Sequence, residues 1–499
     1  MCKIKLLNLY LCGILIILIS LVIYKTSNGI EEIDYTFPDG FLIGTASSSY
    51  QVEGAWNESG KSENLWDYLV HHSSEKILDR SNGDVACDSY HKYKEDIKLM
   101  SDIGINHYRF SLSWSRILPT GYTDYINKDG IQYYHNILDE LEKYGIKPFI
   151  TLYHWDHPQS LERLGGWTNE IMADLFADYA LLVFKEFAAR VKFFSTINEP
   201  YIFCKAGYRT VDFAPSLNLS SWGEYLCMHN MLKGHALAYH IYDKEFRKQY
   251  GGKIGIITPC FHYYSKNNND LESSEVAFEF QCGWGANPIF SKNGDYPELM
   301  KRKLALKSKL EGRRKSKLPS FSKEWIQYIK GSSDYFGLTH YTTYLVEPLL
   351  NNSNTQVQDD ADLIYSIDDQ WLSAQSPWLK IVPRGLADIL RKIKDKYDNP
   401  PVYILENGVS DANTINDTMR IFYLHAYMNE MLTAMKRDKC NVKVYTVWSF
   451  LDSFEWNRGY VDKFGLVSVN FNDPNRTRTP KKSAMWLKKV LASRKLEPY

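Results

Sequence analysis

Two glutamates follow short apolar segments of the chain, and together they have the chemistry to cleave a glycosidic bond. Glu199 follows Phe193–Ile197, and Glu406 follows Val402–Leu405. When two carboxyl groups converge on one pocket, one can donate a proton to the leaving oxygen while the other attacks or screens the anomeric carbon. Taken singly, either residue could be a solvated glutamate at the end of a strand. Whether the two glutamates are catalytic therefore depends on whether the fold brings them together in one pocket.

The neighbours of both glutamates indicate that a strand ends beside them. Pro200 cannot donate a backbone hydrogen bond, so strand pairing should stop there and the Glu199 side chain can face a cleft. Asn407-Gly408 is a turn pair, which should bend the backbone away after Glu406.

Eight short apolar segments recur along the chain, with helical stretches such as Tyr133–Lys143 and Ile171–Arg190 between them. The segments lack clean alternation, which is typical of strands buried on both faces. They are Phe41–Ala46, His107–Trp114, Pro148–His154, Phe193–Ile197, Lys253–Thr258, Tyr335–Thr339, Val402–Leu405 and Val442–Ser449. Eight such units predict an α/β fold, a single (β/α)8 TIM barrel with long loops over residues 30–499. A doubly wound sheet is the alternative, but the glycine-rich stretch at 251–255 precedes a strand instead of following one.

A barrel of this kind carries its active site at the C-terminal ends of the strands. Glu199 and Glu406 end the fourth and seventh segments, which should lie across the barrel mouth from each other. Polar and aromatic residues also end the third, sixth and eighth segments, at His154-Trp155-Asp156, His340-Tyr341, Trp448 and Asp452–Trp456. The loops after the fourth, fifth and sixth strands are expected to line the outer cleft.

Five segments, in unbroken order, resemble the family 1 glycoside hydrolases, and within them the β-glucosidases of the animal secreted type. The segments are Phe37–Trp56, Tyr108–Gly121, Thr196–Pro200, Tyr403–Gly408 and Val447–Leu466. The resemblance implies a retaining double displacement on a (β/α)8 barrel, with a small glycoside as substrate and with no cofactor or metal.

The resemblance also implies roles for individual residues. Glu199 matches the general acid/base and Glu406 the nucleophile, so burial or the charge of Glu406 should raise the pKa of Glu199. Arg109, placed at the end of the second strand, matches the arginine that holds the nucleophile as an anion, and Tyr341 matches its hydrogen-bonding tyrosine. Asn198 is expected to bind the 2-hydroxyl of the sugar, and Trp448 to form the floor beneath the ring. The residues that match sugar-binding positions are Gln51, His154, Asn198, Tyr341, Trp448, Glu455 and Trp456.

The chain departs from the family pattern at three places. The family often has Asn where this chain has Thr339 and Ser453, and it usually has Trp where this chain has Phe194. These departures keep both carboxylates and are expected to affect the fine shape of the pocket.

Several activities fit this set of residues. The leading interpretation is a retaining β-glucosidase that acts on terminal β-D-glucosyl residues of small O-glucosides. A thioglucosidase (myrosinase) acting on glucosinolates is an alternative, because animal thioglucosidases of this family can keep both carboxylates. A transglycosylating relative and a non-catalytic sugar-binding or receptor relative are the others. No motif identifies the aglycone.

Residues 1–29 read as a signal peptide or a retained signal anchor. Lys3 and Lys5 precede the apolar run Leu6–Tyr24, and Ser27-Asn28-Gly29 offers a cleavage site. Either reading places the rest of the chain in the secretory pathway, with secretion expected and membrane association only through a retained anchor. Five N-glycosylation sequons agree with that compartment, at Asn57, Asn218, Asn351, Asn416 and Asn475.

Composition narrows the partners further. The chain of 499 residues has 59 Lys and Arg against 59 Asp and Glu, which gives no general attraction to nucleic acid. Six widely spaced cysteines outside the leader allow at most a few disulfides. The sequence has no C-x-x-C pair, so a zinc site is not expected. A basic run over residues 301–317 is interpreted as a solvated helix and loop. The sequence leaves the oligomeric state open.

Overall fold

The computed structural model describes residues 35–498, apart from 220–221, 268–269, 350–359 and 413. The expected leader at residues 1–29 and the sequon at Asn351 lie outside this part of the chain. Among the helices that are described, none is long and apolar enough to cross a membrane.

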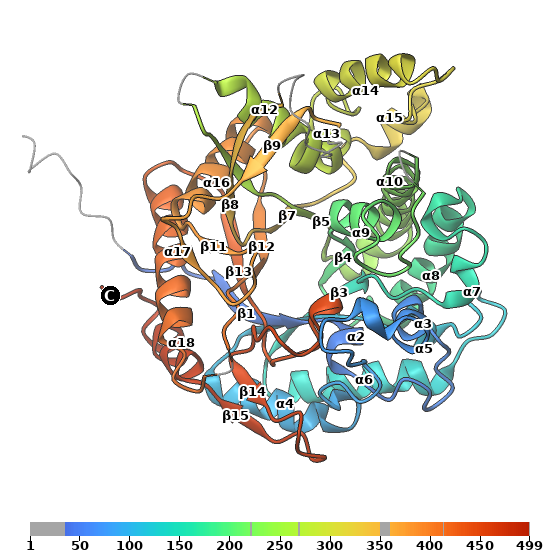
Figure 1. Cartoon of the computed structure of the whole chain (residues 1–499). Helices are drawn as coiled ribbons and strands as arrows, with labels where there is room; N and C mark the ends of the chain where they lie inside the picture. Colours follow the sequence, from blue (N-terminus) through green and yellow to red (C-terminus); the bar gives the residue numbers. More distant parts are fainter. Residues whose placement is uncertain (1–34, 220–221, 268–269, 350–359, 413, 499) are drawn as a thin grey trace, which may run out of the picture.

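Eight parallel strands close into a barrel, in the order β1-β13-β12-β7-β5-β4-β3-β2 (Figure 1). Each of the eight predicted segments supplies one of them, so the prediction of a (β/α)8 barrel is confirmed. The strands are β1 (Leu42–Ser47), β2 (His107–Ser111), β3 (Lys147–Tyr153), β4 (Phe193–Asn198), β5 (Lys253–Pro259), β7 (Phe336–Thr339), β12 (Val402–Asn407) and β13 (Val442–Trp448).

Helices surround the barrel on the outside (Figure 1). The main outer helices are α4 (Ser89–Ile103), α6 (Lys128–Lys143), α8 (Ile171–Phe187), α10 (Gly223–Ile241), α16 (Arg384–Lys396), α17 (Thr418–Lys436) and α18 (Lys482–Ser493). The two helices predicted at Tyr133–Lys143 and Ile171–Arg190 are α6 and α8. Helix α6 begins earlier than predicted, and its first turn holds Asp129, whose charge is favourable near a helix N-terminus.

The barrel strands are buried on both faces. The larger core lies between the strands and the outer helices, with residues such as Ile150 and Phe184. A smaller core includes Phe149, Tyr335 and Tyr403, and the last two stack with their ring centroids 4.2 Å apart. Because both faces need apolar side chains, the strand sequences show no alternation.

Long loops extend the C-terminal end of the barrel. After β5 come β6 (His262–Ser265), α12 (Leu271–Phe278), α13 (Trp284–Phe290), α14 (Glu298–Leu310) and α15 (Lys323–Ile329). After β7 come β8 (Thr343–Pro348) and β9 (Leu363–Ser366), and β8 pairs with both β6 and β9 in a three-stranded sheet. Two disulfides tie the loops at this end, Cys204–Cys227 after β4 and Cys260–Cys282 after β5, while Cys87 and Cys440 are buried and free.

The basic run is more ordered than the sequence suggested. It covers α14 and the loop that follows, where Lys303 and Lys307 pair with Asp362. Lys317 is only 2% exposed and lies 2.6 Å from a carboxylate oxygen of Asp360. The expectation of a fully solvated helix and loop is therefore wrong for this part of the run, because acidic residues distant in the sequence neutralise it.

Candidate active site

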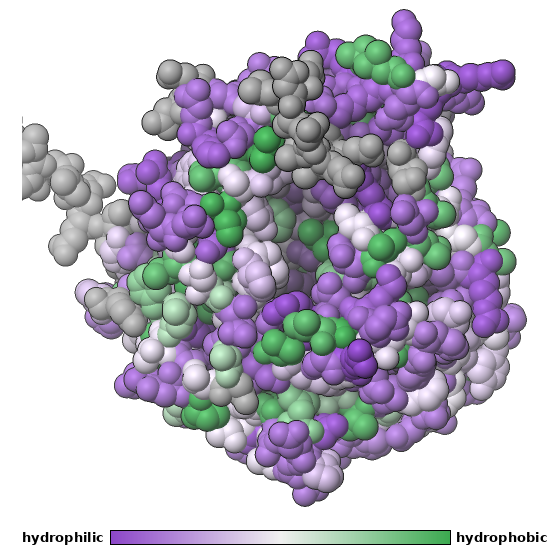
Figure 2. All heavy atoms as spheres, in the orientation of Figure 1, coloured by the Kyte–Doolittle hydropathy of each residue, from purple (hydrophilic) through white to green (hydrophobic). Residues whose placement is uncertain are grey.

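A cavity of about 310 Å³ opens at the C-terminal ends of the barrel strands, and the molecular surface is hollowed at the centre of this face (Figure 2). Seven of the predicted site residues line the cavity: His154, Glu199, Tyr341, Glu406, Trp448, Glu455 and Trp456. The other three, Gln51, Arg109 and Asn198, are fully buried behind this lining and hydrogen-bond to its members.

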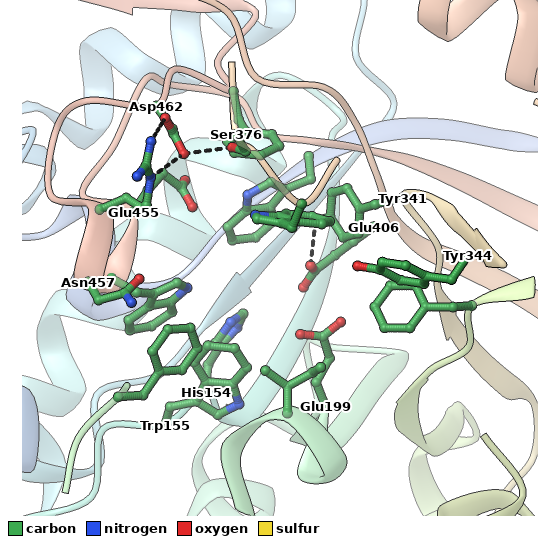
Figure 3. Close-up of a pocket in the computed structure, with 18 residues that line it drawn as sticks. His154, Trp155, Glu199, Tyr341, Tyr344, Ser376, Glu406, Glu455, Asn457 and Asp462 are labelled. Atoms are coloured by element: carbon green, nitrogen blue, oxygen red, sulfur yellow. Dashed lines mark hydrogen bonds and ion pairs between the residues drawn. The ribbon is translucent and has the colours of Figure 1, made fainter. Parts of the chain in front are cut away.

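A sharp turn at the end of β4 directs Glu199 into the cavity. The strand ends at Asn198, Glu199 adopts the left-handed conformation with φ of 43°, and Pro200 begins α9 (Pro200–Tyr208). This φ is unfavourable for a residue with a side chain, and such strain is tolerated where the surroundings hold it. The proline thus ends the strand as predicted, and the Glu199 carboxyl group faces that of Glu406 (Figure 3).

The environment of Glu199 favours its protonated form. Burial, followed by the negative charge of Glu406, raises the pKa of Glu199 to about 8. The Thr339 hydroxyl donates a hydrogen bond to Glu199 Oε1, which acts in the opposite direction. The carboxyl group can therefore carry a proton at neutral pH, as a general acid requires.

The carboxyl group of Glu406 accepts hydrogen bonds from two side chains. Arg109 Nη1 lies 2.6 Å from Oε1, and the Tyr341 hydroxyl donates to Oε2 at 2.7 Å. Burial and the charge of Glu406 raise the pKa of Tyr341 well above its usual value, so its hydroxyl keeps the proton that it donates. Strand β12 continues through Asn407, so Glu406 lies inside the strand instead of directly after it.

Arg109 lies in the middle of β2 and not at its end. The predicted position was wrong, but the long side chain reaches the cavity floor from there. Its Nε donates to Thr151 at 2.9 Å and its Nη2 donates to Asn198 Oδ1 at 2.7 Å. Arg109 therefore joins β2 to Glu406 and to the residue before Glu199.

Hydrogen bonds from Arg109 through Asn198 determine the orientation and the tautomer of His154. Arg109 can only donate, so Asn198 must present its oxygen to Arg109 and its Nδ2 to His154 Nε2, 3.0 Å away. Burial and the charge of Arg109 lower the pKa of His154 well below its usual value, so the ring is neutral. Nε2 accepts, and Nδ1 carries the proton with no partner among the described residues. An added hydroxyl group could accept that hydrogen bond.

The remaining predicted residues form a polar and an aromatic side of the cavity. Gln51, on α2 (Ser49–Val52), donates from Nε2 to Glu455 Oε1 at 3.2 Å. Burial raises the pKa of Glu455 well above its usual value. The ring centroids of Trp448 and Trp456 each lie 5.8 Å from that of His154.

Gly408 permits the close approach of β12 and β13 beside the site. A Cβ atom at this position would lie 1.8 Å from the backbone oxygen of Trp448. Only glycine fits at position 408, because any side chain would collide with the backbone of Trp448. The sequence interpretation treated Gly408 only as part of a turn and did not predict this contact.

Two of the three departures from the family pattern touch the site. Thr339 bonds to Glu199, and the Ser453 hydroxyl donates to Glu455 Oε1 at 3.1 Å. Phe194 instead packs against Phe184 of α8, with ring centroids 5.2 Å apart, and does not line the cavity.

The cavity also has lining residues that sequence reasoning did not assign. They are Trp155, Ile202, Phe213, Phe261, Tyr344, Ser376, Trp378, Asn457, Arg458, Asp462 and Phe464. Most come from the loops after β4, β5, β7 and β13. Asn457, Arg458, Asp462 and Phe464 lie in the family-like segment Val447–Leu466, but no local motif marks the others. The chain is 14% aromatic, and that figure does not identify individual rings. Within the described residues, no group of three or more His, Cys, Asp or Glu is arranged to hold a metal ion.

A (β/α)8 barrel with two facing carboxyl groups at the C-terminal end of its strands defines a glycoside hydrolase. The sequence profile described as Glycosyl hydrolase family 1 matches residues 33–496. The chain therefore belongs to glycosyl hydrolase family 1 and is a glycoside hydrolase.

Proteins with named activities are similar to this chain over almost all of its length. Myrosinase 1 of Brevicoryne brassicae is 46% identical over 93% of this chain and 100% of its own length. The solved structure of an aphid myrosinase has a TM-score of 0.89 at 45% identity, covering 93% of this chain and 100% of that chain. A rice β-glucosidase mutant, solved in a covalent complex with glucose, has a TM-score of 0.85 at 37% identity, covering 91% and 98%.

Proposed function

We propose that the protein is a retaining β-glucosidase that hydrolyses terminal β-D-glucosyl residues of small O-glucosides. The observation that carries this proposal is the pair of buried carboxyl groups that face each other across the cavity in unlike settings (Figure 3). Arg109 and Tyr341 hold Glu406 ready to attack, whereas burial keeps Glu199 protonated. A proton donor and an anionic nucleophile are what a double displacement needs.

In the first step, a Glu406 oxygen forms a bond to the anomeric carbon while the bond to the leaving oxygen breaks. Glu199 gives its proton to that oxygen, so the aglycone departs as a neutral alcohol. Glycosylation removes the charge of Glu406, which had raised the pKa of Glu199. Glu199 then takes a proton from water as the water oxygen attacks the anomeric carbon and the bond to Glu406 breaks. The product keeps the β-configuration.

The buried polar groups suit a glucosyl ring. The proton on His154 Nδ1 has no partner among the described residues and can be donated to a sugar hydroxyl. The neutral Glu455 lines the cavity and can bind a second hydroxyl, while Gln51, buried behind it, donates to Glu455 Oε1 and to the backbone oxygen of Phe454. Trp448 can lie against the C–H face of the ring, since sugars combine an apolar face with a polar rim.

The aglycone that fits the rest of the cavity is apolar and uncharged. The loops after β4, β5 and β7 contribute Ile202, Phe213, Phe261, Tyr344 and Trp378 to its lining. Trp378 is 38% exposed, so its ring can contact an aglycone without being fully withdrawn from water. Arg458 also lines the cavity, but Asp462 already neutralises it, at 2.9 Å. β-Glucosides of aryl and alicyclic alcohols are therefore the proposed substrates.

Hydrolysis of S-glucosides is the second candidate, because Myrosinase 1 of Brevicoryne brassicae is among the similar proteins. Cleavage of a thioglucoside would use the same nucleophile, Glu406, but would depend less on Glu199, because a thiolate leaves without protonation. The two candidates thus differ in how far activity survives the loss of Glu199.

A panel of aryl, alkyl, disaccharide and thio β-glucosides tests these proposals, with proton NMR of the first sugar released. The expected result is turnover of aryl and alkyl O-glucosides with β-glucose appearing first. Release of α-glucose would contradict the double displacement, and preference for the thioglucoside would favour the second candidate.

Glu199→Gln should spare activated aryl glucosides more than alkyl ones, since good leaving groups need no acid. Transfer products in added alcohol would identify a transglycosylating enzyme, and no turnover of any glycoside would indicate a non-catalytic sugar-binding protein.

We further propose that the chain enters the secretory pathway. Two disulfides support this, because such bonds form and persist in oxidising compartments. Four of the sequons lie in the described chain, and the side chains of Asn57, Asn218, Asn416 and Asn475 are all exposed. Both features fit the expected leader at residues 1–29.

A further inference from the structure

The backbone around the nucleophile is held by a side chain from the outside of the barrel. Tyr423 lies on α17, a helix of the outer ring, and is completely buried. Its hydroxyl lies 2.8 Å from the backbone oxygen of Tyr341 and 3.0 Å from Nδ2 of Asn407. Tyr341 donates a hydrogen bond to Glu406, and Asn407 follows Glu406 in the chain. One hydroxyl thus contacts both segments that position the nucleophile.

The direction of each hydrogen bond follows from what its partner can do. The backbone oxygen of His340 only accepts, so the Asn407 amide must turn its nitrogen toward it, at 2.6 Å. The backbone oxygen of Tyr341 also only accepts, so the Tyr423 hydroxyl donates to it and accepts from Asn407. The Tyr445 hydroxyl donates to the remaining oxygen of Asn407. Every hydrogen-bonding atom of the Asn407 side chain is therefore used, which leaves the amide a single orientation.

Tyr427 offers a comparison one helical turn away on the same face of α17. Its ring stacks on that of Tyr423, with centroids 4.0 Å apart, and it is equally buried. Its hydroxyl donates to the same Tyr341 oxygen at 3.1 Å, but its second partner is the backbone N–H of Val382. Tyr427 therefore shares the acceptor with Tyr423 and lacks the bond to Asn407.

We infer that Tyr423 is a positioning residue for the glycosylation step, acting through Asn407 and Tyr341 on the placement of Glu406. The inference rests on the proposed role of Glu406 as nucleophile. Tyr423 touches neither substrate nor the reacting atoms. Its hydroxyl fixes the spacing between the end of β12 and the residues after β7, and hence the approach of the Tyr341 hydroxyl to the carboxylate.

The test compares Tyr423→Phe with the matched control Tyr427→Phe. Each change removes one buried hydroxyl and keeps the ring, so similar losses of thermal stability are expected. For Tyr423→Phe, kcat on an aryl β-glucoside should fall about tenfold with little change in KM, because a small displacement of a reacting group has large kinetic effects. The rate of covalent inactivation by an activated 2-fluoro-β-glucoside should fall by the same factor. Tyr427→Phe should lose much less of both rates. Equal kinetic losses in the two variants would overturn the inference.

A double-mutant cycle shows whether Tyr423 acts through Tyr341. Adding Tyr423→Phe to Tyr341→Phe should reduce kcat much less than it does in the wild-type background, since coupled residues are not additive. Independent, multiplying effects would contradict the inference. Tyr445→Phe removes a different bond of Asn407 and should show the same loss of kcat, which covers the case that Tyr423→Phe does not fold. If the activated 2-fluoro-β-glucoside did not inactivate the wild-type protein, that result would contradict the proposed function. Equal kinetic losses in the variants would contradict only the role of Tyr423.

Discussion

Thr339 is the residue whose contact with Glu199 most directly changes the proposed chemistry. It ends β7, and its hydroxyl donates to the carboxyl group of the proposed acid/base. A donor stabilises the charged form of a carboxyl group, so this contact partly offsets the effect of burial on the pKa of Glu199. The chain thus has at this position a side chain that can adjust the pH range of activity.

The pH dependence follows from the raised pKa of Glu199. The acid must be protonated, so kcat/KM should fall as the pH rises through the pKa of about 8. Thr339→Val removes the donor and keeps the shape, so the basic limb of the profile should move to higher pH. A pH–rate profile of both proteins with an alkyl β-glucoside checks this. A limb that stays in place, or that moves to lower pH, would contradict the role of this hydrogen bond.

Some site residues could be predicted from the sequence and others could not, depending on whether local sequence or tertiary packing determines their position. Glu199 and Glu406 could be found because one directly follows its strand and the other is the last residue but one of its strand, with residues beside each that mark the turn. The contact of Thr339 with Glu199 could not, because it depends on the packing of two strands that are not sequence neighbours. Arg109 was predicted at the end of its strand but lies in the middle, because the pattern of apolar residues does not show how far a long side chain extends.

At the scale of elements, the βα loops are held by ion pairs that distant segments complete. Asp360 accepts from Lys317 at 2.6 Å and from the Tyr225 hydroxyl at 2.6 Å, and Arg209 lies 3.3 Å from it. These partners come from α10, the loop after α9 and the loop after α14. The network thus joins the loops after β4, β5 and β7.

Removing the centre of this network should destabilise the protein. Asp360→Ala leaves the buried Lys317 charge without this partner, which typically costs about 3 kcal/mol or more. The free energy of unfolding, measured by denaturant titration, should fall accordingly. Lys301→Ala is the control, because its pair with Asp295 is partly exposed and such pairs contribute about 0–1 kcal/mol. Equal stability of the two variants would show that Asp360 does not hold the loops.

The eight barrel strands could be predicted from the sequence because burial on both faces leaves a continuous apolar pattern. The sheet of β6, β8 and β9 could not, since its short strands are partly exposed and pair across long loops. For the same reason Phe261 and Tyr344, which line the cavity from these loops, had no signal in the sequence. The apolar part of the site is thus a property of tertiary packing.

At the scale of the whole molecule, the disulfides and the exposed sequons support the proposal that this glycoside hydrolase enters the secretory pathway. Cys204–Cys227 closes the loop after β4, and Cys260–Cys282 closes the loop after β5. Both loops carry residues of the cavity lining. The disulfides therefore link the loops that form the proposed aglycone site.

Secretion can be checked with the full chain expressed in a eukaryotic host. The protein should appear in the medium or in the secretory organelles, with Cys204, Cys227, Cys260 and Cys282 oxidised. Endoglycosidase treatment should lower its mass, and Asn-to-Gln changes at the sequons should remove that shift. A cytosolic protein with free thiols and no glycan would contradict the proposed compartment.

The most direct test of the account is to trap the glycosyl-enzyme with an activated 2-fluoro-β-glucoside and to map the labelled peptide by mass spectrometry. The account predicts one sugar per chain, attached to Glu406, with the label lost in Glu406→Gln and retained in Glu199→Gln. A label on another residue, or steady turnover of β-glucosides with no covalent adduct, would contradict the double displacement.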